Sequence, residues 1–387
     1  MKTLVKKKIN LFKMKKLLLL LFAFLLVSNA FAQHFFDTDF NTRKKYIILC
    51  DPTVHRIKTI QYLTDNDILK VNKNKVKFVG VYYEKQKSDY PKTQDYINEN
   101  GLDNFFLHEI TGDLNETNLY QENDVTAQLK KVFDNSIGII FFGGADIPPA
   151  IYGEENTKSG VYTPARHYYE ATFMFHLLGG YQDESFKPFL AERPDYVVTG
   201  FCLGMQTMNV GTGGTLIQDI PAEIYNAETP EETVAIGRAN MHRNYWQLIE
   251  EDSLFMGINL HTIQFTDNPF FGETIKVSKK ATPRIYSSHH QAIEKLGKGM
   301  EVTCLSPDGK IIEGVAHSTY PHVFAVQFHP EVSALYEDMD LKIFHPDDEP
   351  KTYHDILGKS DVKFHKDYWK HISESFKDVK KPKYNQN

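Results

Sequence analysis

Short apolar runs, separated by segments with helical spacing, constrain the fold of this 387-residue chain more than any other feature. Each run is short enough to be a buried strand, and the first four are expected to be parallel. The predicted strands are Lys45–Cys50, Val76–Tyr83, Ile137–Phe142, Tyr196–Thr199 and Val323–Phe328. Segments 126–133 and 166–178 space their apolar residues as helices do. Because strand and helix alternate, we predict an α/β fold, with a doubly wound, mostly parallel sheet and helices on both faces.

The later part of the chain has a different pattern. From Pro283 to Phe328, strand signals recur with turns such as SPDG between them, which predicts a smaller, more antiparallel region. The polar segment Tyr336–Lys359 is predicted to be an irregular insertion before an amphipathic helix near Asp367–Phe376 and a solvated Lys-rich tail. We therefore expect one principal domain over residues 33–335, with residues 336–387 packed on it.

The N-terminus combines a basic start, an apolar run and small residues. Several lysines precede the run Leu17–Val27, and the sequence NAFAQ follows, with Ala30 and Ala32. This order is typical of a signal peptide, so residues 1–32 are predicted to be cleaved and the mature protein to be secreted or periplasmic. A membrane anchor is the alternative, but the run is shorter than the roughly 20 apolar residues of a spanning helix. Cys50 lies too far along the chain to become the lipidated N-terminal residue of a lipoprotein. No stable membrane span is expected after cleavage.

Composition restricts the partners. A net charge of −6 and a pI near 6.2 provide no broad basic surface, so nucleic acid is not expected as a partner. Three cysteines leave at least one without an intramolecular disulfide in an exported chain. Cys50 and Cys304 lie in strand-like segments, where buried, inert thiols are expected. No feature of the sequence predicts an oligomeric state.

Cys202 lies in a different setting, within the segment DYVVTGFCLGMQ. It follows a predicted strand, precedes a run with helical character and is flanked by Gly200 and Gly204. This pattern is typical of a nucleophile elbow, where the backbone is strained and bulky neighbours would collide with adjacent elements. The start of a helix also favours the thiolate, which is the reactive form. A cysteine between glycines can equally be a tight turn, so this motif alone assigns no function.

A second segment, VFAVQFHPEV, places His329 and Glu331 two residues apart after a predicted strand. At strand spacing both side chains point to the same face, so the carboxylate can orient the imidazole. An imidazole held in this way can polarise a thiol. An isolated His-x-Glu is commonly a solvated turn, so its meaning depends on the rest of the chain.

Together, GFCLGMQ and QFHPE resemble the class I glutamine amidotransferase superfamily, whose members place a cysteine elbow well before a His-Pro-Glu segment. The segments FFGGADIPPAIYGEE, MNVGTGGTLIQDI and SSHHQAI are similar to its γ-glutamyl hydrolase branch, the C26 peptidases, which includes γ-glutamyl-γ-aminobutyrate hydrolases. The resemblance covers roughly Lys45 to Val332, and several motifs in the same order argue against a chance match. It implies a flavodoxin-like three-layer sandwich.

The resemblance also implies roles for individual residues. Cys202 corresponds to the nucleophile, His329 to the general base and then acid, and Glu331 to the group that orients the imidazole. Backbone N–H groups of Gly144, in the loop FFGGAD, and of Leu203 would form the oxyanion hole. An ordinary strand-to-loop turn is the alternative for this glycine loop.

Substrate contacts follow from the same resemblance. Gln206, Ser287 and His289 would contact the glutamyl end of a small γ-glutamyl substrate. A buried glutamine can instead simply pack, and paired histidines in a loop are often only solvated. The sixteen histidines show no metal-binding spacing such as H-E-x-x-H, so no metal site is expected. Acyl transfer through a cysteine needs no cofactor.

The chain departs from the family pattern in three places. Leu203 follows the nucleophile where arginine is expected in many close relatives, which leaves the side-group preference open but spares the backbone oxyanion role. Residues 179–195 and 336–359 look like insertions, and either could reshape the substrate cleft.

We predict an exported cysteine hydrolase that cleaves γ-glutamyl amide bonds through a glutamyl thioester. The leaving amine stays open among γ-aminobutyrate, polyamines, folyl polyglutamate and γ-linked peptides. One alternative is a glutaminase subunit that passes ammonia to a synthetase, which export disfavours. A second alternative is a non-catalytic protein of the same fold that binds a γ-glutamyl ligand, which the complete set of triad residues disfavours.

Overall fold

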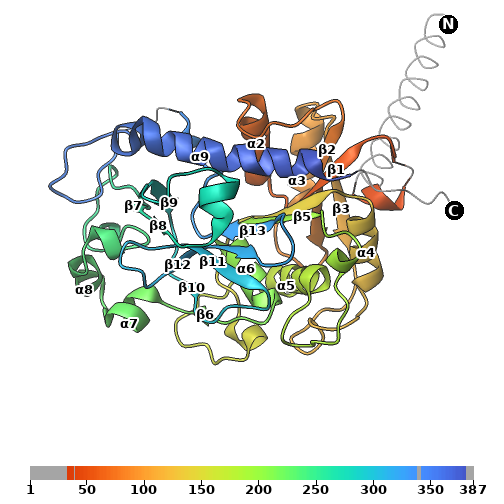
Figure 1. The fold of residues 1–387 in the computed structure, drawn as a ribbon, viewed down its shortest axis with the longest axis horizontal. Helices are drawn as coiled ribbons and strands as arrows, with labels where there is room; N and C mark the ends of the chain where they lie inside the picture. The colour runs from red at the N-terminus through yellow and green to blue at the C-terminus, as the bar shows by residue number, and fades with distance from the viewer. Residues whose placement is uncertain (1–32, 39, 338–340, 381–387) are drawn as a thin grey trace, which may run out of the picture.

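A nine-stranded sheet forms the centre of the computed structural model, which describes residues 33–38, 40–337 and 341–380 (Figure 1). The strand order is β3-β2-β1-β4-β5-β13-β12-β11-β8. These strands are β1 (Lys45–Cys50), β2 (Val76–Tyr83), β3 (Phe105–Ile110), β4 (Gly138–Phe141), β5 (Val197–Phe201), β8 (Gln264–Phe265), β11 (Met300–Leu305), β12 (Ile312–His317) and β13 (Val323–Val326). The predicted signal peptide and the end of the Lys-rich tail lie outside the described residues.

The sheet is mostly parallel, as predicted. Every neighbouring pair from β3 to β13 is parallel, and β12, β11 and β8 extend the sheet with antiparallel pairs. The antiparallel part therefore falls within the region after Pro283, apart from the short strand β8. In the part of the chain that the structure describes, no helix combines the length and apolar character required to cross a membrane.

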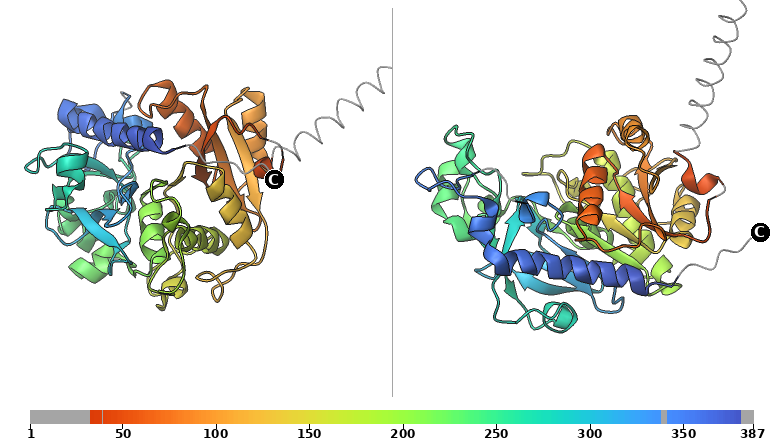
Figure 2. Two further views of the ribbon diagram at one scale, coloured as in Figure 1. Left: turned by 45° about the vertical axis from the view of Figure 1, so that its right-hand side comes forward. Right: turned by 90° about the horizontal axis from the view of Figure 1, so that it is seen from above.

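Successive residues of the central strands enter two separate cores, because strand side chains alternate between the two faces. In β1, Ile48 and Cys50 face the core on one side, and Ile47 and Leu49 face the other. The first side is covered by α4 (Thr126–Asp134), α5 (Pro164–Leu178) and α6 (Leu203–Gly211), and the second by α2 (Val54–Asp65), α3 (Tyr90–Glu99) and α9 (Tyr353–Asp378). Figure 2 shows the sheet between these two layers. The predicted three-layer arrangement is confirmed.

The C-terminal helix α9 is longer than predicted. It begins at Tyr353 because Thr352 caps it. The Thr352 hydroxyl accepts from the Asp355 N–H, and the Asp355 carboxylate accepts from the Thr352 N–H. Gly358, with a φ of 66°, interrupts the helix soon after it begins. The last part of the segment predicted to be irregular is therefore helical.

Trp369 of α9 is fully buried against the sheet and binds the segment that follows β13. Its indole Nε1 donates to the Pro330 carbonyl at 2.8 Å, and the Tyr336 hydroxyl donates to the same carbonyl at 2.5 Å. Pro330 lies between His329 and Glu331, so the last helix holds the segment that carries both predicted site residues.

A smaller region lies beside the antiparallel part of the sheet. It contains the short helices α7 (Ile220–Tyr225) and α8 (Pro230–Ala235) and the antiparallel pairs β6 (Leu216–Ile217) with β10 (Ala292–Ile293) and β7 (Asn259–Thr262) with β9 (Arg284–Ser287). Met241, Met256, Leu260, Phe344 and Leu357 belong to a separate apolar core of this region. Part of the predicted insertion 336–359 is thus packed into this core.

The other predicted insertion, residues 179–195, lies away from Cys202. The Tyr181 N–H donates to the Thr212 carbonyl, and Gln182 Nε2 donates to the Val210 carbonyl, both at the C-terminal end of α6. Cys202 is at the opposite end of that helix, about 13 Å away at 1.5 Å per residue. This insertion therefore supports the far end of α6, and none of its residues lines the two cavities described below.

Candidate active site

Cys202 lies at the turn between β5 and α6. Its backbone has φ 53° and ψ −109°, a conformation that L-residues rarely adopt. Its N–H donates to the Val326 carbonyl of β13 at 2.9 Å. A Cβ on Gly200 would lie 2.6 Å from the Gly204 backbone, and a Cβ on Gly204 would lie 2.4 Å from the Phe141 oxygen. The structure therefore forms the predicted elbow, and close packing requires both glycines.

Strand β13 brings His329 to Cys202. It is parallel to β5, with Val326 paired with Phe201, so the segments that follow the two strands leave the sheet side by side. The His329 imidazole lies beside Cys202, since both border Gly143, and its Nδ1 lies 2.7 Å from Oε1 of Glu331. Thiol, imidazole and carboxylate thus form a continuous chain of contacts.

The charges around His329 favour its protonated form. Burial alone lowers the pKa of this imidazole, but the Glu331 carboxylate and the Cys202 side chain outweigh burial and raise the pKa of His329 well above its ordinary value. A protonated imidazole beside sulfur stabilises the thiolate, and the N-terminus of α6 acts in the same direction. The arrangement is suited to nucleophilic attack by sulfur.

Two arginines orient the loop that follows β4. Arg56 donates to the Gly143 carbonyl at 2.6 Å, and Arg166 donates to it at 3.2 Å. In a trans peptide the N–H points opposite to the C=O, so the Gly144 N–H points away from both guanidinium groups. A Cβ on Gly144 would lie 2.7 Å from Cδ2 of Leu203, whose own N–H has no partner within α6. Gly144 and Leu203 are therefore in contact through the Leu203 side chain.

Both arginines are fixed by buried carboxylates. Asp51 forms ion pairs with Arg56 and with Arg166, the latter at 3.2 Å. Arg166 Nε also donates to Glu170 at 2.8 Å, one helical turn along α5. The sequence analysis missed these residues, because an arginine within an ordinary helical pattern carries no recognisable motif.

Two cavities meet at the candidate triad. One, of about 390 Å³, is lined by Cys202 and Gln206, and the other, of about 580 Å³, is lined by His329 and Glu331. Ser288 lines both cavities. The thiol and the imidazole therefore face a divided cleft that can hold the two halves of one substrate.

The cavity beside the thiol carries groups of opposite charge. Asp146, Arg243 and His290 all line it. His290 lies between two carboxylates, with its Nε2 3.0 Å from Asp146 and its Nδ1 3.0 Å from Asp219. Burial lowers the pKa of His290, but the hydrogen bonds to both carboxylates outweigh burial and raise it. This cavity can bind a ligand that bears both an ammonium and a carboxylate group.

The cavity beside the imidazole is mainly basic. His55, Arg56 and Lys58 of α2 line it together with Tyr286 of β9. Glu331 is the acidic residue of this lining, and its carboxylate is bonded to His329. The cavity therefore offers more positive than negative groups to a ligand.

The predicted substrate residues lie near the thiol but differ in what they contact. Gln206 lines the thiol cavity, and its Nε2 donates to the Gln291 carbonyl at 3.2 Å. The Ser287 hydroxyl is buried and donates to the His242 carbonyl at 2.6 Å, so the exposed Ser288 lines the cleft in its place. His289 borders the cavity, but its ring contacts a buried cluster described below.

Sequence reasoning missed several residues that line the cleft, among them Ser288, His290 and Arg243. Ser288 and His290 belong to the SSHHQ segment, so a strand-alternation argument could have selected them. Arg243 lies in the segment MHRNY, which carries no motif that signals a role.

The remaining cysteines are structural. All three cysteines are free, and Cys50 in β1 and Cys304 in β11 are fully buried. Burial raises the pKa of both thiols well above the ordinary value, so they stay protonated. The expectation of buried, inert thiols at these two positions agrees with the structure.

The fold and this site define a class I glutamine amidotransferase-like protein. Residues 118–331 match the model of the family described as Peptidase C26, and the chain belongs to that family. Membership implies a hydrolase of the glutamine amidotransferase-like type.

Curated relatives carry names of the same kind. The glutamine amidotransferase-like protein YvdE of Lactococcus lactis subsp. lactis (strain IL1403) is 29% identical over 61% of this chain and 83% of its own length. A protein of Mycobacterium tuberculosis (strain ATCC 25618 / H37Rv), named as the glutamine amidotransferase Rv2859c, is 30% identical over 55% of each chain. A crystal structure of a GMP synthase protein from Thermoplasma acidophilum aligns with 86% of this chain and 94% of its own, at 12% identity and a TM-score of 0.36.

Proposed function

We propose that the protein is a cysteine hydrolase that cleaves γ-glutamyl amide bonds. The observation that carries the proposal is the cavity in which Cys202 lies beside Asp146 and Arg243. A γ-glutamyl group ends in an α-ammonium and an α-carboxylate, which a carboxylate and a guanidinium complement. Its γ-carbonyl, at the other end of the same side chain, would then lie at the thiolate.

The proposed reaction has two steps. The Cys202 thiolate attacks the γ-carbonyl carbon, and the Gly144 and Leu203 N–H groups stabilise the oxyanion. The C–N bond then breaks while His329 donates a proton to the departing amine, which leaves a glutamyl thioester. His329 next takes a proton from water as the water attacks the thioester, and glutamate leaves as the thiolate is restored.

The basic cavity supports a specific kind of leaving amine. His55 and Lys58 line the side of the cleft that borders His329, where the amine would depart. The Arg56 guanidinium and the Lys58 ammonium of this lining favour an amine that carries a carboxylate, such as γ-aminobutyrate or glutamate, over a polyamine. A dicarboxylic amide substrate is therefore the proposed class.

A matched pair of substrates tests this proposal. γ-Glutamyl-γ-aminobutyrate and γ-glutamylputrescine have similar lengths and differ in the charge at the far end. We expect release of glutamate from both, with kcat/KM about tenfold or more in favour of the carboxylate, as measured by mass spectrometry of both products. Binding without release of glutamate would contradict hydrolysis and indicate a ligand-binding protein.

The names of the relatives favour a second candidate, in which the released amine is ammonia from glutamine. Glutamine fills the thiol cavity in the same way but leaves the basic cavity without a ligand group. A kcat/KM for glutamine above that for γ-glutamyl-γ-aminobutyrate would favour a glutaminase.

Export by the N-terminal segment is also proposed, on the basic and apolar pattern of residues 1–32. Expression of the full chain in a bacterial host is expected to give a mature protein that begins at Gln33. A cell-associated chain that keeps its first residues would contradict cleavage.

A further inference from the structure

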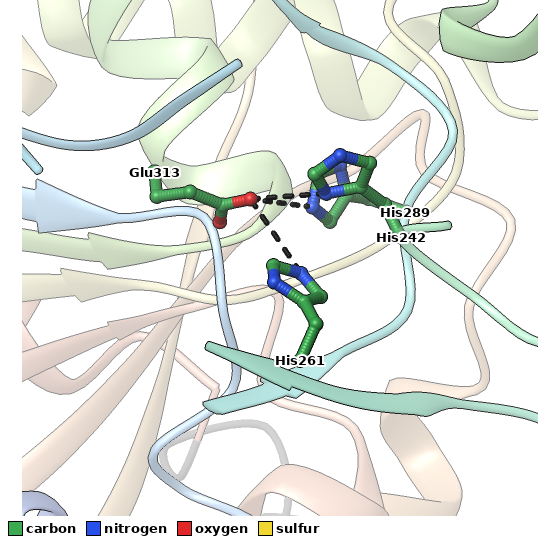
Figure 3. Close-up of side chains that lie close together, drawn as sticks. All are labelled: His242, His261, His289 and Glu313. Carbon is green, nitrogen blue, oxygen red and sulfur yellow. Dashed lines mark ion pairs between the residues drawn. The ribbon is translucent and has the colours of Figure 1, made fainter. Parts of the chain in front are cut away.

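Four buried side chains from separate segments converge next to the active-site cleft (Figure 3). His242 lies in the loop after residues 238–240, His261 in β7, His289 after β9 and Glu313 in β12. Their potential ligand atoms all lie within 4.8 Å of one another, and each side chain is at most 4% exposed. Figure 3 shows the three rings directed at one carboxylate oxygen.

The distances from the carboxylate to the three rings are those of a coordination shell, and the most widely separated ligand atoms of the cluster are up to 4.8 Å apart. Glu313 Oε1 lies 3.0 Å from His242 Nδ1, 3.6 Å from His261 Nε2 and 3.7 Å from His289 Nε2. The two longer contacts exceed hydrogen-bond range, and the His242 nitrogen lacks hydrogen-bond geometry. Ligands at 2.0–2.1 Å from a tetrahedral zinc ion are about 3.3 Å apart, within the range seen here.

Two of the histidines are fixed in the form that binds metals. His261 Nδ1 is 2.9 Å from the Thr262 carbonyl, and His289 Nδ1 is 2.9 Å from the Gln291 carbonyl. A carbonyl can only accept, so each Nδ1 carries the hydrogen and each Nε2 presents its lone pair to the cluster. Metal-binding histidines are commonly held by this kind of bond to a carbonyl.

The charge of the cluster also points to a cation. The Glu313 side chain is fully buried, and within the described residues its ion-pair partners are these three histidines. A carboxylate that is fully buried needs partners that compensate for its lost solvation. A divalent ion would neutralise it and engage the nitrogen and oxygen atoms that have no hydrogen-bond partner.

We propose that His242, His261, His289 and Glu313 bind one divalent transition-metal ion, with zinc as the favoured occupant. Three imidazoles and one carboxylate are ligands that zinc accepts, and four protein ligands complete a tetrahedral site. A closed shell of this kind is structural. The ion would anchor the loop 288–291, which forms a wall of the thiol cavity, to the central sheet.

The experiment measures metal in the full-length protein that carries Cys202→Ala, because a cysteine and histidine in contact can themselves bind zinc. Protein purified without chelator, or incubated with Zn²⁺ and desalted, is expected to contain about one metal ion per chain by mass spectrometry. Replacement by Co²⁺ is expected to give the visible absorption of four-coordinate cobalt. A folded protein that holds less than about a tenth of an equivalent after incubation with Zn²⁺ would overturn the proposal.

Matched variants assign the ion to this cluster. His261→Gln and Glu313→Gln are expected to lose at least about 90% of the bound metal. His176→Gln, in an equally buried histidine whose Nδ1 also contacts a carbonyl, is expected to keep it. Retention of a full equivalent by folded His261→Gln would overturn the proposal. If either variant fails to fold, the Tm of the chelator-treated parent protein is measured with and without Zn²⁺. A rise in Tm supports the site, and an unchanged Tm overturns the proposal, because an ion that binds the folded state stabilises it.

Discussion

Two groups of histidine and glutamate lie in neighbouring parts of the molecule, and they differ in how many rings share one carboxylate. At the candidate triad, Glu331 holds one imidazole through Nδ1 and leaves Nε2 to the thiol. In the buried cluster, Glu313 is shared by three imidazoles. The first arrangement raises the pKa of its histidine, whereas burial lowers the pKa of His261 to about 4.

This difference teaches that the same pair of residue types can serve two kinds of chemistry. A single ring between carboxylate and thiol can hold and transfer a proton. Several neutral rings whose lone pairs point at one place can bind a metal ion. The two sites have the same residue types but differ in what the second ring nitrogen contacts. In the triad His329 lies between the carboxylate and the thiol, whereas in the cluster His261 and His289 are bonded to backbone carbonyls.

The largest effect is expected from removal of the thiol. Cys202→Ala should lower kcat/KM for γ-glutamyl amides at least about 10⁴-fold, because the covalent step is lost. The change removes one sulfur from a small side chain, so circular dichroism should match that of the parent. Activity within tenfold of the parent would contradict the assigned nucleophile.

Glu331→Gln should lower kcat about 10³-fold, because the imidazole loses the carboxylate that orients and charges it. The pKa of His329 is raised in the folded state, so the ion pair stabilises the protein fully below about pH 6.5, and this stability is lost as pH rises through the raised pKa. Urea unfolding should therefore show the largest stability loss of Glu331→Gln at acid pH and a smaller loss at alkaline pH. An equal loss at every pH would refute this coupling.

A smaller effect is expected from Arg166→Lys, which keeps the charge but cannot bind both the Gly143 carbonyl and Glu170. If these contacts aim the Gly144 N–H at the oxyanion, kcat should fall about tenfold while KM stays within about twofold. Arg193→Lys is the control, since Arg193 also donates to two backbone carbonyls, but those of Phe133 and Ser136. Equal kcat and KM values for the two variants would contradict the positioning role of Arg166.

The smallest effect is expected from Trp369→Phe. The change removes the indole bond to the Pro330 carbonyl and leaves a small cavity, at a cost of about 1–3 kcal/mol in the free energy of unfolding. Activity should fall only a few fold, through looser placement of His329, and metal content should not change. Chemical denaturation measures the stability and enzyme kinetics measure the activity of the same preparation. A loss of activity as large as that of Glu331→Gln would contradict a purely supporting role for α9.

Local patterns predicted much of the fold, because the periodicity of strands and helices can be recognised from residues that are close together in the sequence. The bounds of β1 and β2 agree with the prediction residue for residue. Strand β3 was missed because its sequence, FFLHEI, contains a histidine and a glutamate and does not read as an apolar run. The order of strands in the sheet was beyond sequence reasoning, since it depends on contacts between distant segments.

The candidate site likewise contains residues that short motifs predicted and residues that only the structure brings together. Cys202, His329 and Glu331 were predicted from short motifs, and the structure brings them into contact. The buried cluster was missed, and no metal site was expected, because its histidines come from separate segments and no regular spacing links them. Ser287 was chosen for the cleft instead of Ser288 because a motif does not reveal which face of a strand each residue occupies.

Helix α9 acts unequally on the two sides of the candidate triad. Its Trp369 supports the Pro330 carbonyl beside the imidazole, whereas Cys202 is fixed by the turn between β5 and α6 and by its own bond to β13. A change that loosens α9 from the sheet should therefore disturb the imidazole before it disturbs the thiol, so that proton transfer slows while alkylating reagents still reach the sulfur.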